Sequence, residues 1–256
     1  MAAVREEHSS TIYGRNPVLE LLRSRGRKIE ALCLLANGRG GLKDLLALAR
    51  QQGVRVSFRT RDQLTAMAGT PHHQGVVCRV AEKEYVALED LISVAAGRDE
   101  PAFFLALDQV QDPRNLGGLL RTAEAMGVHG IVLPRHNAAG LTASAAKASM
   151  GALEFVAVTR VTNLVAAIEV MKKQGVWIYG TAPAAGVRAW EADLTRPLCL
   201  VLGGEGKGVR PLVAQSCDLL LTLPMPGHIG SLNVGAAGAA LCYEVVRQRF
   251  HKKFLT

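Results

Sequence analysis

Three short polar segments interrupt a largely apolar C-terminal region, and their residue types could act on a bound ligand. The first covers residues 108–121 and contains Asn115 and Arg121, with Gly117 and Gly118 between them. An amide and a guanidinium can hydrogen-bond to sugar hydroxyls and phosphates. Glycines in the first turn of a helix let a ligand approach the backbone closely. The segment therefore indicates binding, although Asn115 as a helix cap and Arg121 as a surface residue remain the alternatives.

The second segment is a glycine-rich bend that follows a buried apolar run. Residues 203–208 contain four glycines, and Glu205 stands among them. The bend is not a phosphate loop of the GxxxxGK[ST] type, because the first glycine is missing and no Ser or Thr follows Lys207. It is not a GxGxxG dinucleotide fingerprint either. A simple glycine-rich turn would leave Glu205 unexplained.

The third segment, residues 223–234, leads into the last predicted helix. Ser231 or Asn233 could cap that helix, and His228 is interpreted as a surface loop residue without chemistry.

The elements that would position these segments alternate between apolar strands and helices. We expect strands at 103–107, 130–133, 155–158, 176–179, 198–202 and 219–223, and helices at 116–126, 142–149, 163–174, 209–215 and 232–250. Short apolar strands separated by helices favour an α/β fold with a parallel sheet covered on both faces. Ligands of such sheets bind beyond the carboxyl ends of the strands, where all three segments lie. The Gly/Ala-rich start of the last helix predicts close packing against another element or a partner subunit.

The rest of the chain divides into an N-terminal region and a linker that leads to the C-terminal region. Residues 1–10 are expected to be disordered, and residues 11–82 to form a small α/β domain. Residues 83–100 are expected to be a linker, 101–250 the larger parallel-sheet domain, and 251–256 a basic tail. In the small domain, strands are predicted at 29–35, 54–58 and 75–80, and helices at 18–23, 42–52 and 61–68. Asn16 and Pro17 are expected to start its first helix. The linker contains one predicted helix, at residues 88–96.

Charge and cysteine usage narrow the class of protein. The net charge is +8, and residues 1–82 carry 13 Lys/Arg against 7 Asp/Glu, which suggests a polyanionic partner such as RNA. The five cysteines have no metal-ligand or redox spacing and are expected to be reduced and mostly buried. We expect no metal site, and a soluble cytoplasmic protein without a signal sequence or membrane span.

Together and in this order, the three segments resemble the SpoU/TrmH-type ribose 2′-O-methyltransferases of the SPOUT class. The match rests on Asn115 with Arg121, on Gly203 to Gly208 with Glu205, and on Ser231-Leu232-Asn233-Val234. Residues 13–18 and 73–76 are similar to the ribosomal-protein-like (L30e/L7Ae-like) RNA-binding domain that precedes the catalytic domain in large-subunit rRNA guanosine 2′-O-methyltransferases.

The resemblance implies a deep trefoil knot spanning roughly residues 198–249, a homodimer packed through it, and S-adenosylmethionine as methyl donor, with S-adenosylhomocysteine as product. The implied substrate is a guanosine of 23S rRNA. The resemblance implies donor-binding roles for Thr181, Gly203, Gly204, Leu223, Met225, Ile229 and Leu232. It implies catalytic roles for Arg121, Asn115, Glu205, Ser231 and Asn233. We interpret Arg121 as an electrostatic group rather than a base, because guanidinium does not give up its proton in proteins.

Two other interpretations remain open at this point. A tRNA methyltransferase would share all three segments, and a non-catalytic RNA-binding or ribosome-assembly protein could keep the same fold. The intact set of Asn115, Arg121, Glu205 and Asn233 argues against the second. A nucleotide- or NAD-dependent enzyme is disfavoured because both phosphate-binding fingerprints are missing.

Overall fold

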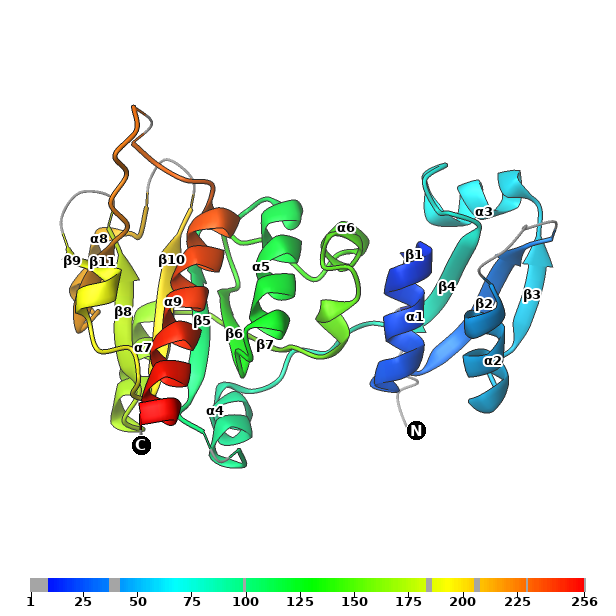
Figure 1. Ribbon diagram of the computed structural model, residues 1–256. Helices are drawn as coiled ribbons and strands as arrows, with labels where there is room; N and C mark the ends of the chain where they lie inside the picture. Colours follow the sequence, from blue (N-terminus) through cyan, green and yellow to red (C-terminus); the bar gives the residue numbers. More distant parts are fainter. Residues whose placement is uncertain are drawn as a thin grey trace, which may run out of the picture. The chain divides into compact units, whose positions relative to one another are not determined.

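The computed structural model describes residues 9–36, 42–98, 100–182, 186–204, 208–228 and 230–255 (Figure 1). The chain forms two compact units, and each is described by itself. The first contains residues 1–84 together with Gly140–Phe155, and the second contains Tyr85–Ala139 and Val156–Thr256. None of the helices in the described part of the chain combines the length and apolar character needed to cross a bilayer.

The first unit is built on a four-stranded mixed sheet with the order β1-β4-β2-β3. Its elements are β1 (Ser9–Tyr13), α1 (Arg15–Ser24), β2 (Ile29–Leu35), α2 (Lys43–Gln51), β3 (Val56–Arg59), α3 (Arg61–Ala68) and β4 (Val76–Ala81). Strand β4 runs antiparallel to β1 and β2, whereas β2 and β3 are parallel. Leu64 of α3 packs against Cys33 and Val77, so this helix closes one small core. The predicted strands and the predicted helices 42–52 and 61–68 are confirmed here to within two residues, whereas α1 begins three residues before the predicted helix 18–23. Strand β1 was not predicted, and it includes Ser9 and Ser10 of the expected disordered terminus.

The start of α1 differs from the expectation. The helix begins at Arg15, so Asn16 is a helical residue and not its cap. The backbone N–H of Arg15 donates instead to Gln74 Oε1 at 3.0 Å. Gln74 has a positive φ of 56° and lies in the turn before β4. This hydrogen bond links residues 13–18 to residues 73–76, which are the two N-terminal segments that resemble the RNA-binding domain.

The segment 140–155 completes the first unit. It contains α6 (Ala143–Ala148) and the short 3-10 helix η1 (Ala152–Glu154). The guanidinium of Arg27 lies 2.6 Å from the Glu154 carboxylate, and both side chains are almost fully buried. Lys83 Nζ donates to the Glu154 carbonyl. Separating these two side chains would leave a buried charge without its partner, which is strongly destabilising. The ion pair therefore holds this segment to the first unit.

The second unit is an all-parallel sheet with the order β7-β6-β5-β10-β8-β11-β9. Its strands are β5 (Phe103–Asp108), β6 (Gly130–Pro134), β7 (Ala157–Val161), β8 (Trp177–Thr181), β9 (Val187–Arg188), β10 (Leu198–Gly203) and β11 (Leu219–Thr222). Its helices are α4 (Leu88–Ala96), α5 (Pro113–Ala125), α7 (Leu164–Lys173), α8 (Pro211–Gln215) and α9 (Val234–Leu255), with η2 (Ala189–Glu191). The expected α/β class and parallel sheet are confirmed.

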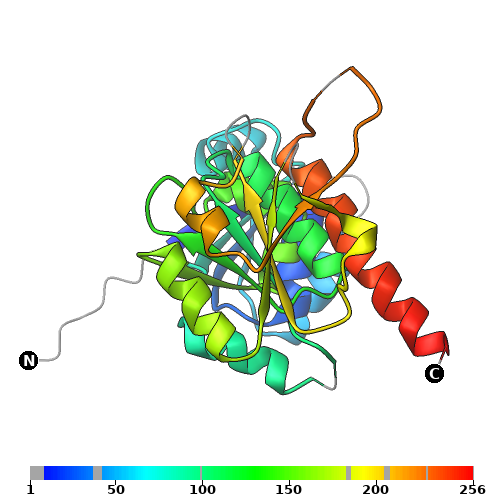
Figure 2. The same cartoon turned by 90° about the vertical axis from the view of Figure 1, so that its left-hand side faces the viewer.

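Helices cover both faces of this sheet. Buried residues of α4, α7 and α8 form one core with the strands, so α4, expected in a linker, is part of this unit. Helix α9 packs against α5 and β10 on the other face (Figure 2). A Cβ on Gly238 would lie 2.5 Å from Leu119 Cδ2 and 2.9 Å from Leu202 Cδ1, so a larger residue here would force these two side chains to shift. The Gly/Ala-rich helix therefore packs closely against another element, as predicted.

Some predicted boundaries in this unit were wrong. Strand β7 begins at Ala157, two residues later than expected, because η1 ends at Glu154 and Phe155 is its C-terminal cap. Strand β9 was not predicted, and α9 continues to Leu255 into the expected tail. The cysteines are all free thiols; four are buried and Cys217 is partly buried, as expected.

Candidate active site

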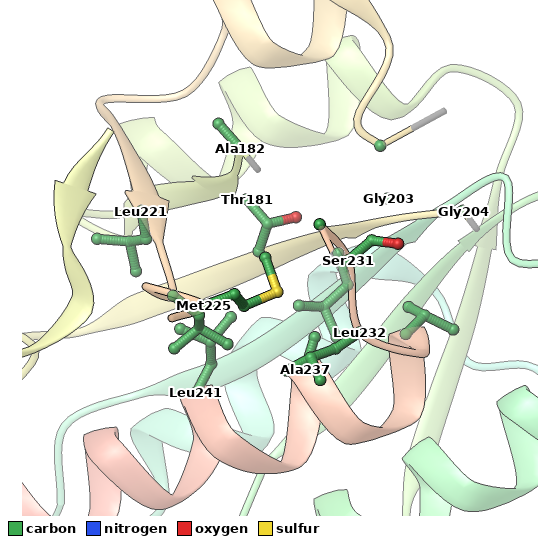
Figure 3. A pocket seen from close by; sticks show the side chains of 15 residues that line it. Thr181, Ala182, Gly203, Gly204, Leu221, Met225, Ser231, Leu232, Ala237 and Leu241 are labelled. Atoms are coloured by element: carbon green, nitrogen blue, oxygen red, sulfur yellow. The ribbon is translucent and has the colours of Figure 1, made fainter. Parts of the chain in front are cut away.

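The glycine-rich bend after β10 and the bend before α9 line one cavity of about 340 Å³. Figure 3 shows the lining side chains reaching it from the strand ends and from α9. The lining residues are Thr181, Ala182, Leu202, Gly203, Gly204, Gly208, Leu221, Leu223, Met225, Gly230, Ser231, Leu232, Val234, Ala237 and Leu241. The volume lies at the lower end of the range for small-molecule sites.

The two glycines at the end of β10 are required by the backbone of the bend itself. A Cβ on Gly203 would lie 2.0 Å from the carbonyl carbon of Gly208, and one on Gly204 would lie 2.5 Å from the Gln109 carbonyl oxygen. Gly208 has a φ of 63°, which favours glycine. The bend is therefore folded tightly on itself and against the exit of β5, and its glycines leave backbone groups at the cavity wall.

The other walls are mainly apolar. Leu223, Met225 and Leu232 come from the bend before α9, and Ala237 and Leu241 come from α9. Thr181 closes the β8 side, and its hydroxyl donates to the Val201 carbonyl at 3.2 Å. An apolar pocket edged by backbone groups suits a flat aromatic group with polar edges, such as a nucleobase.

Asn115 and Asn233 are brought together although they are far apart in the sequence. The Nδ2 of Asn233 donates to Asn115 Oδ1 at 3.0 Å. The Oδ1 of Asn233 accepts from the backbone N–H groups of Gly235 and Ala236. Asn233 therefore caps α9, as one alternative predicted, and holds Asn115 with the same amide group. Because its oxygen is engaged by backbone donors, the orientation of the amide is fixed.

Asn115 does not cap α5, so that alternative was wrong. The cap is Asp112, whose carboxylate accepts from the Arg114 backbone N–H at 2.8 Å. Hydrogen bonds from the backbone and side chain of Arg114 lower the pKa of this carboxyl. Asn115 lies in the first turn of the helix, where its side chain accepts from Asn233.

Arg121 lies in α5 with an exposed side chain, and it has no hydrogen bond or ion pair with another described residue. Arg121, Asn115 and Asn233 do not line the cavity, whereas Ser231 does. Asn233 nevertheless lies between two lining residues, Leu232 and Val234, so the Asn233–Asn115 pair is next to the cavity wall. Glu205 and Ile229 lie outside the described residues.

The sequence analysis missed one ion pair that ties the site together. The Asp108 carboxylate at the end of β5 is fully buried and accepts from the Arg210 backbone N–H and from its Nε, both at 2.8 Å. Arg210 follows the glycine-rich bend. The pair fastens this bend to the strand that leads into Asn115. The sequence signal for this ion pair was Asp108, the single charged residue at the end of an otherwise apolar strand.

Two family descriptions match the chain. The SpoU rRNA methylase family matches residues 102–243, and the substrate-binding domain of RNA 2′-O ribose methyltransferases matches residues 11–86. The chain belongs to the SpoU rRNA methylase family, with a substrate-binding domain ahead of the methylase domain.

Individual relatives are similar along nearly the whole length. A Bacillus subtilis protein assigned to the TrmH family of tRNA/rRNA methyltransferases, YacO, is 45% identical over 93% of this chain and 95% of its own. The 23S rRNA (guanosine-2′-O-)-methyltransferase RlmB of Nitrosomonas europaea is 40% identical over 94% of this chain and 92% of its own.

A crystal structure of an AdoMet-bound rRNA methyltransferase from Sinorhizobium meliloti superposes with a TM-score of 0.78 at 26% identity, covering 93% of this chain and 87% of that one.

Proposed function

We propose that this protein transfers a methyl group from S-adenosylmethionine to the ribose 2′-hydroxyl of a guanosine in 23S rRNA. The observation that carries the proposal is the single cavity formed by the two bends, next to a helix start where Asn233 holds Asn115. The RlmB relatives support the rRNA target, because they match both units of the chain at about 40% identity. The name of the Bacillus relative keeps tRNA as the alternative substrate.

The cavity fits the methyl donor. The apolar walls at Leu223, Met225 and Leu232 would hold the adenine, and the backbone at Gly203 and Gly204 would hydrogen-bond to its polar edges. Thr181 would close one side of the donor site. Ile229 is also proposed to bind the donor. The bound donor supplies a sulfonium methyl that is already electrophilic. The protein must therefore align the ribose oxygen and assist the loss of its proton.

The proposed catalytic roles follow from position and chemistry. Arg121 holds the phosphate beside the target ribose and stabilises the negative charge that develops on the 2′-oxygen. Asn115, kept in place by Asn233, orients the ribose. Ser231 supplies a hydroxyl at the edge of the cavity, and Glu205 binds the incoming nucleotide. No described group of three His, Cys, Asp or Glu side chains could hold a metal ion, and none is part of the proposal.

Further parts of the proposal concern architecture. We place an L30e/L7Ae-like RNA-binding domain in the first unit, and a trefoil knot in residues 198–249. The return of α9 from β11, past β8, to pack on β10 and α5 is compatible with a knot. A homodimer through this region is supported by exposed apolar residues of α9, Tyr243 and Phe250. The compartment is the cytoplasm, where rRNA is available.

The test is to map 2′-O-methyl marks on rRNA and tRNA in a strain that lacks the protein, and to methylate 23S transcripts with the purified enzyme and labelled donor. The expected result is the loss of one guanosine mark in 23S rRNA and its restoration in vitro. A lost tRNA mark would assign the alternative substrate. Unchanged marks on both RNAs, with no transfer in vitro, would leave a non-catalytic RNA-binding protein. Sedimentation of the purified protein tests the dimer.

A further inference from the structure

A second hollow in the catalytic unit carries positively charged side chains that the proposed methyl transfer does not use. It is lined by Tyr85–Glu89, by Arg135 and His136 after β6, and by Thr159–Val161 at the end of β7. Its volume is about 730 Å³. Because the sheet is all parallel, this hollow lies at the same carboxyl edge as the exit of β5.

Arg160 is held in a fixed orientation. One of its terminal nitrogens donates to the Arg135 carbonyl at 2.9 Å, and its guanidinium lies 5.2 Å from the centre of the Tyr85 ring. The Arg160 side chain is partly buried, whereas Arg135 and His136 are exposed. A guanidinium restrained in this way loses little freedom when it binds an oxyanion.

The charges around the hollow favour a phosphate. Two arginines line it, and the acidic residue among its lining residues is Glu89 in the first turn of α4. None of the ion pairs among the described residues involves Arg135, Arg160 or Glu89. The arginines are therefore not neutralised by an ion pair with a described residue.

The position of the hollow relative to β5 indicates that the phosphate belongs to the backbone of the bound RNA. Strands β6 and β7 follow β5 in the sheet, so the hollow lies about 10 Å along the edge from the strand that leads to Asn115. That spacing is close to the length of one or two nucleotides. An RNA strand that presents its target ribose at α5 would continue across this edge.

We propose that Arg135 and Arg160 bind a backbone phosphate of the RNA beside the target nucleotide. This inference rests on the proposed function, since it places the target ribose at α5. The contact is independent of sequence: it fixes the register of the RNA and does not select a base. Glu89 also lines the hollow, and its negative charge repels a phosphate that approaches it.

The test measures RNA affinity across salt concentrations for Arg135→Gln, Arg160→Gln and Glu89→Gln. The probes are a 23S rRNA transcript and poly(U), with S-adenosylhomocysteine present. Each arginine variant is expected to bind both RNAs about tenfold more weakly. The slope of log K against log salt should fall by nearly one for each. Glu89→Gln should bind more tightly, because it removes a repulsive charge.

Lys173→Gln is the matched control. Lys173 is an exposed cation at the end of α7, at the opposite edge of the same sheet, and its loss should change neither RNA affinity nor salt slope. Affinity for S-adenosylhomocysteine and the melting temperature report whether each variant is folded. Arg135 is exposed, so its variant carries the test even if Arg160→Gln unfolds.

Wild-type affinity and slope in both arginine variants, or an equal loss in Lys173→Gln, would overturn the proposal. The poly(U) measurements keep the outcome separate from the proposed function. If the wild type leaves 23S rRNA unmethylated but the arginine variants lose poly(U) affinity, the proposed function fails and the phosphate contact stands.

Discussion

The amide of Asn233 donates to Asn115 Oδ1 at 3.0 Å while its own oxygen accepts from the first N–H groups of α9. One side chain thus sets the start of the last helix and the orientation of a residue 118 positions earlier in the chain. The substitution Asn233→Asp separates these tasks. The carboxylate still caps the helix, but it cannot donate to Asn115. We expect an unchanged melting temperature and at least a tenfold loss of methyl transfer.

Asn233→Ala should behave differently, because it removes the cap as well. The expected cost is about 1 kcal/mol of unfolding free energy in addition to the loss of activity. Urea unfolding and a labelled-donor assay on both variants distinguish the two effects. Full activity of Asn233→Asp would show that the link to Asn115 has no role in the reaction.

Arg121 is predicted to act on the acceptor and not on the donor. Arg121→Ala should lower the rate of methyl transfer by about 10²–10³-fold, which is the effect of removing one preorganised electrostatic donor. Affinity for S-adenosylhomocysteine, measured by calorimetry, should stay close to that of the wild type, since Arg121 does not line the cavity. Near-normal turnover of the variant would refute the role.

The Asp108–Arg210 pair is predicted to hold the glycine-rich bend. Arg210→Ala removes every side-chain donor of residue 210 and leaves a fully buried carboxylate with only the backbone N–H of residue 210 among its observed donors. The unfolding free energy should fall by about 2 kcal/mol, and the affinity for S-adenosylhomocysteine by about tenfold. Arg247→Ala is the control, because Arg247 makes a more exposed ion pair with Glu244, at 2.7 Å, and its loss should cost less than 1 kcal/mol. Equal effects of the two substitutions would contradict a specific role for Arg210.

The first unit is predicted to supply RNA affinity through cations at its β3 edge. Arg55, Arg59 and Arg61 are exposed there, next to Phe58, whose side chain is 55% exposed. The triple substitution to Gln should lower the salt slope of RNA binding by about two to three. Donor affinity should not change. An unchanged slope would place the main RNA contacts elsewhere.

Stability should depend on pH through His129. Burial lowers the pKa of this imidazole, with Arg98 adding to the effect and Glu100 opposing it. Its Nδ1 accepts from the Phe103 backbone N–H at 3.1 Å, which requires an unprotonated nitrogen. Below pH 6.5 the unfolded chain binds the proton more readily than the folded one, so the unfolding free energy should fall as the pH drops. His129→Asn keeps an acceptor and should lose part of this dependence in urea titrations. A pH profile identical to that of the wild type would exclude His129 as a source.

Much of the architecture could be predicted from local patterns. Apolar runs such as 198–202 and the helix at 61–68 are specified by neighbouring residues, because strand and helix periodicity depend on local sequence. The three polar segments could be assigned to strand ends for the same reason. Helix starts were less certain: α1 takes its cap from Gln74, a residue 59 positions away from Arg15.

Chain order alone specifies which residue types stand at the ends of the strands, because each strand end is defined by local sequence. Their partners depend on the three-dimensional fold: Asn115 contacts Asn233, and Asp108 pairs with Arg210. In the same way, the 140–155 segment folds with the first unit through Arg27 and Glu154. The physical reason is that hydrogen bonds and ion pairs depend on distances of about 3 Å, which are set by how the sheet and helices pack and not by separation along the chain.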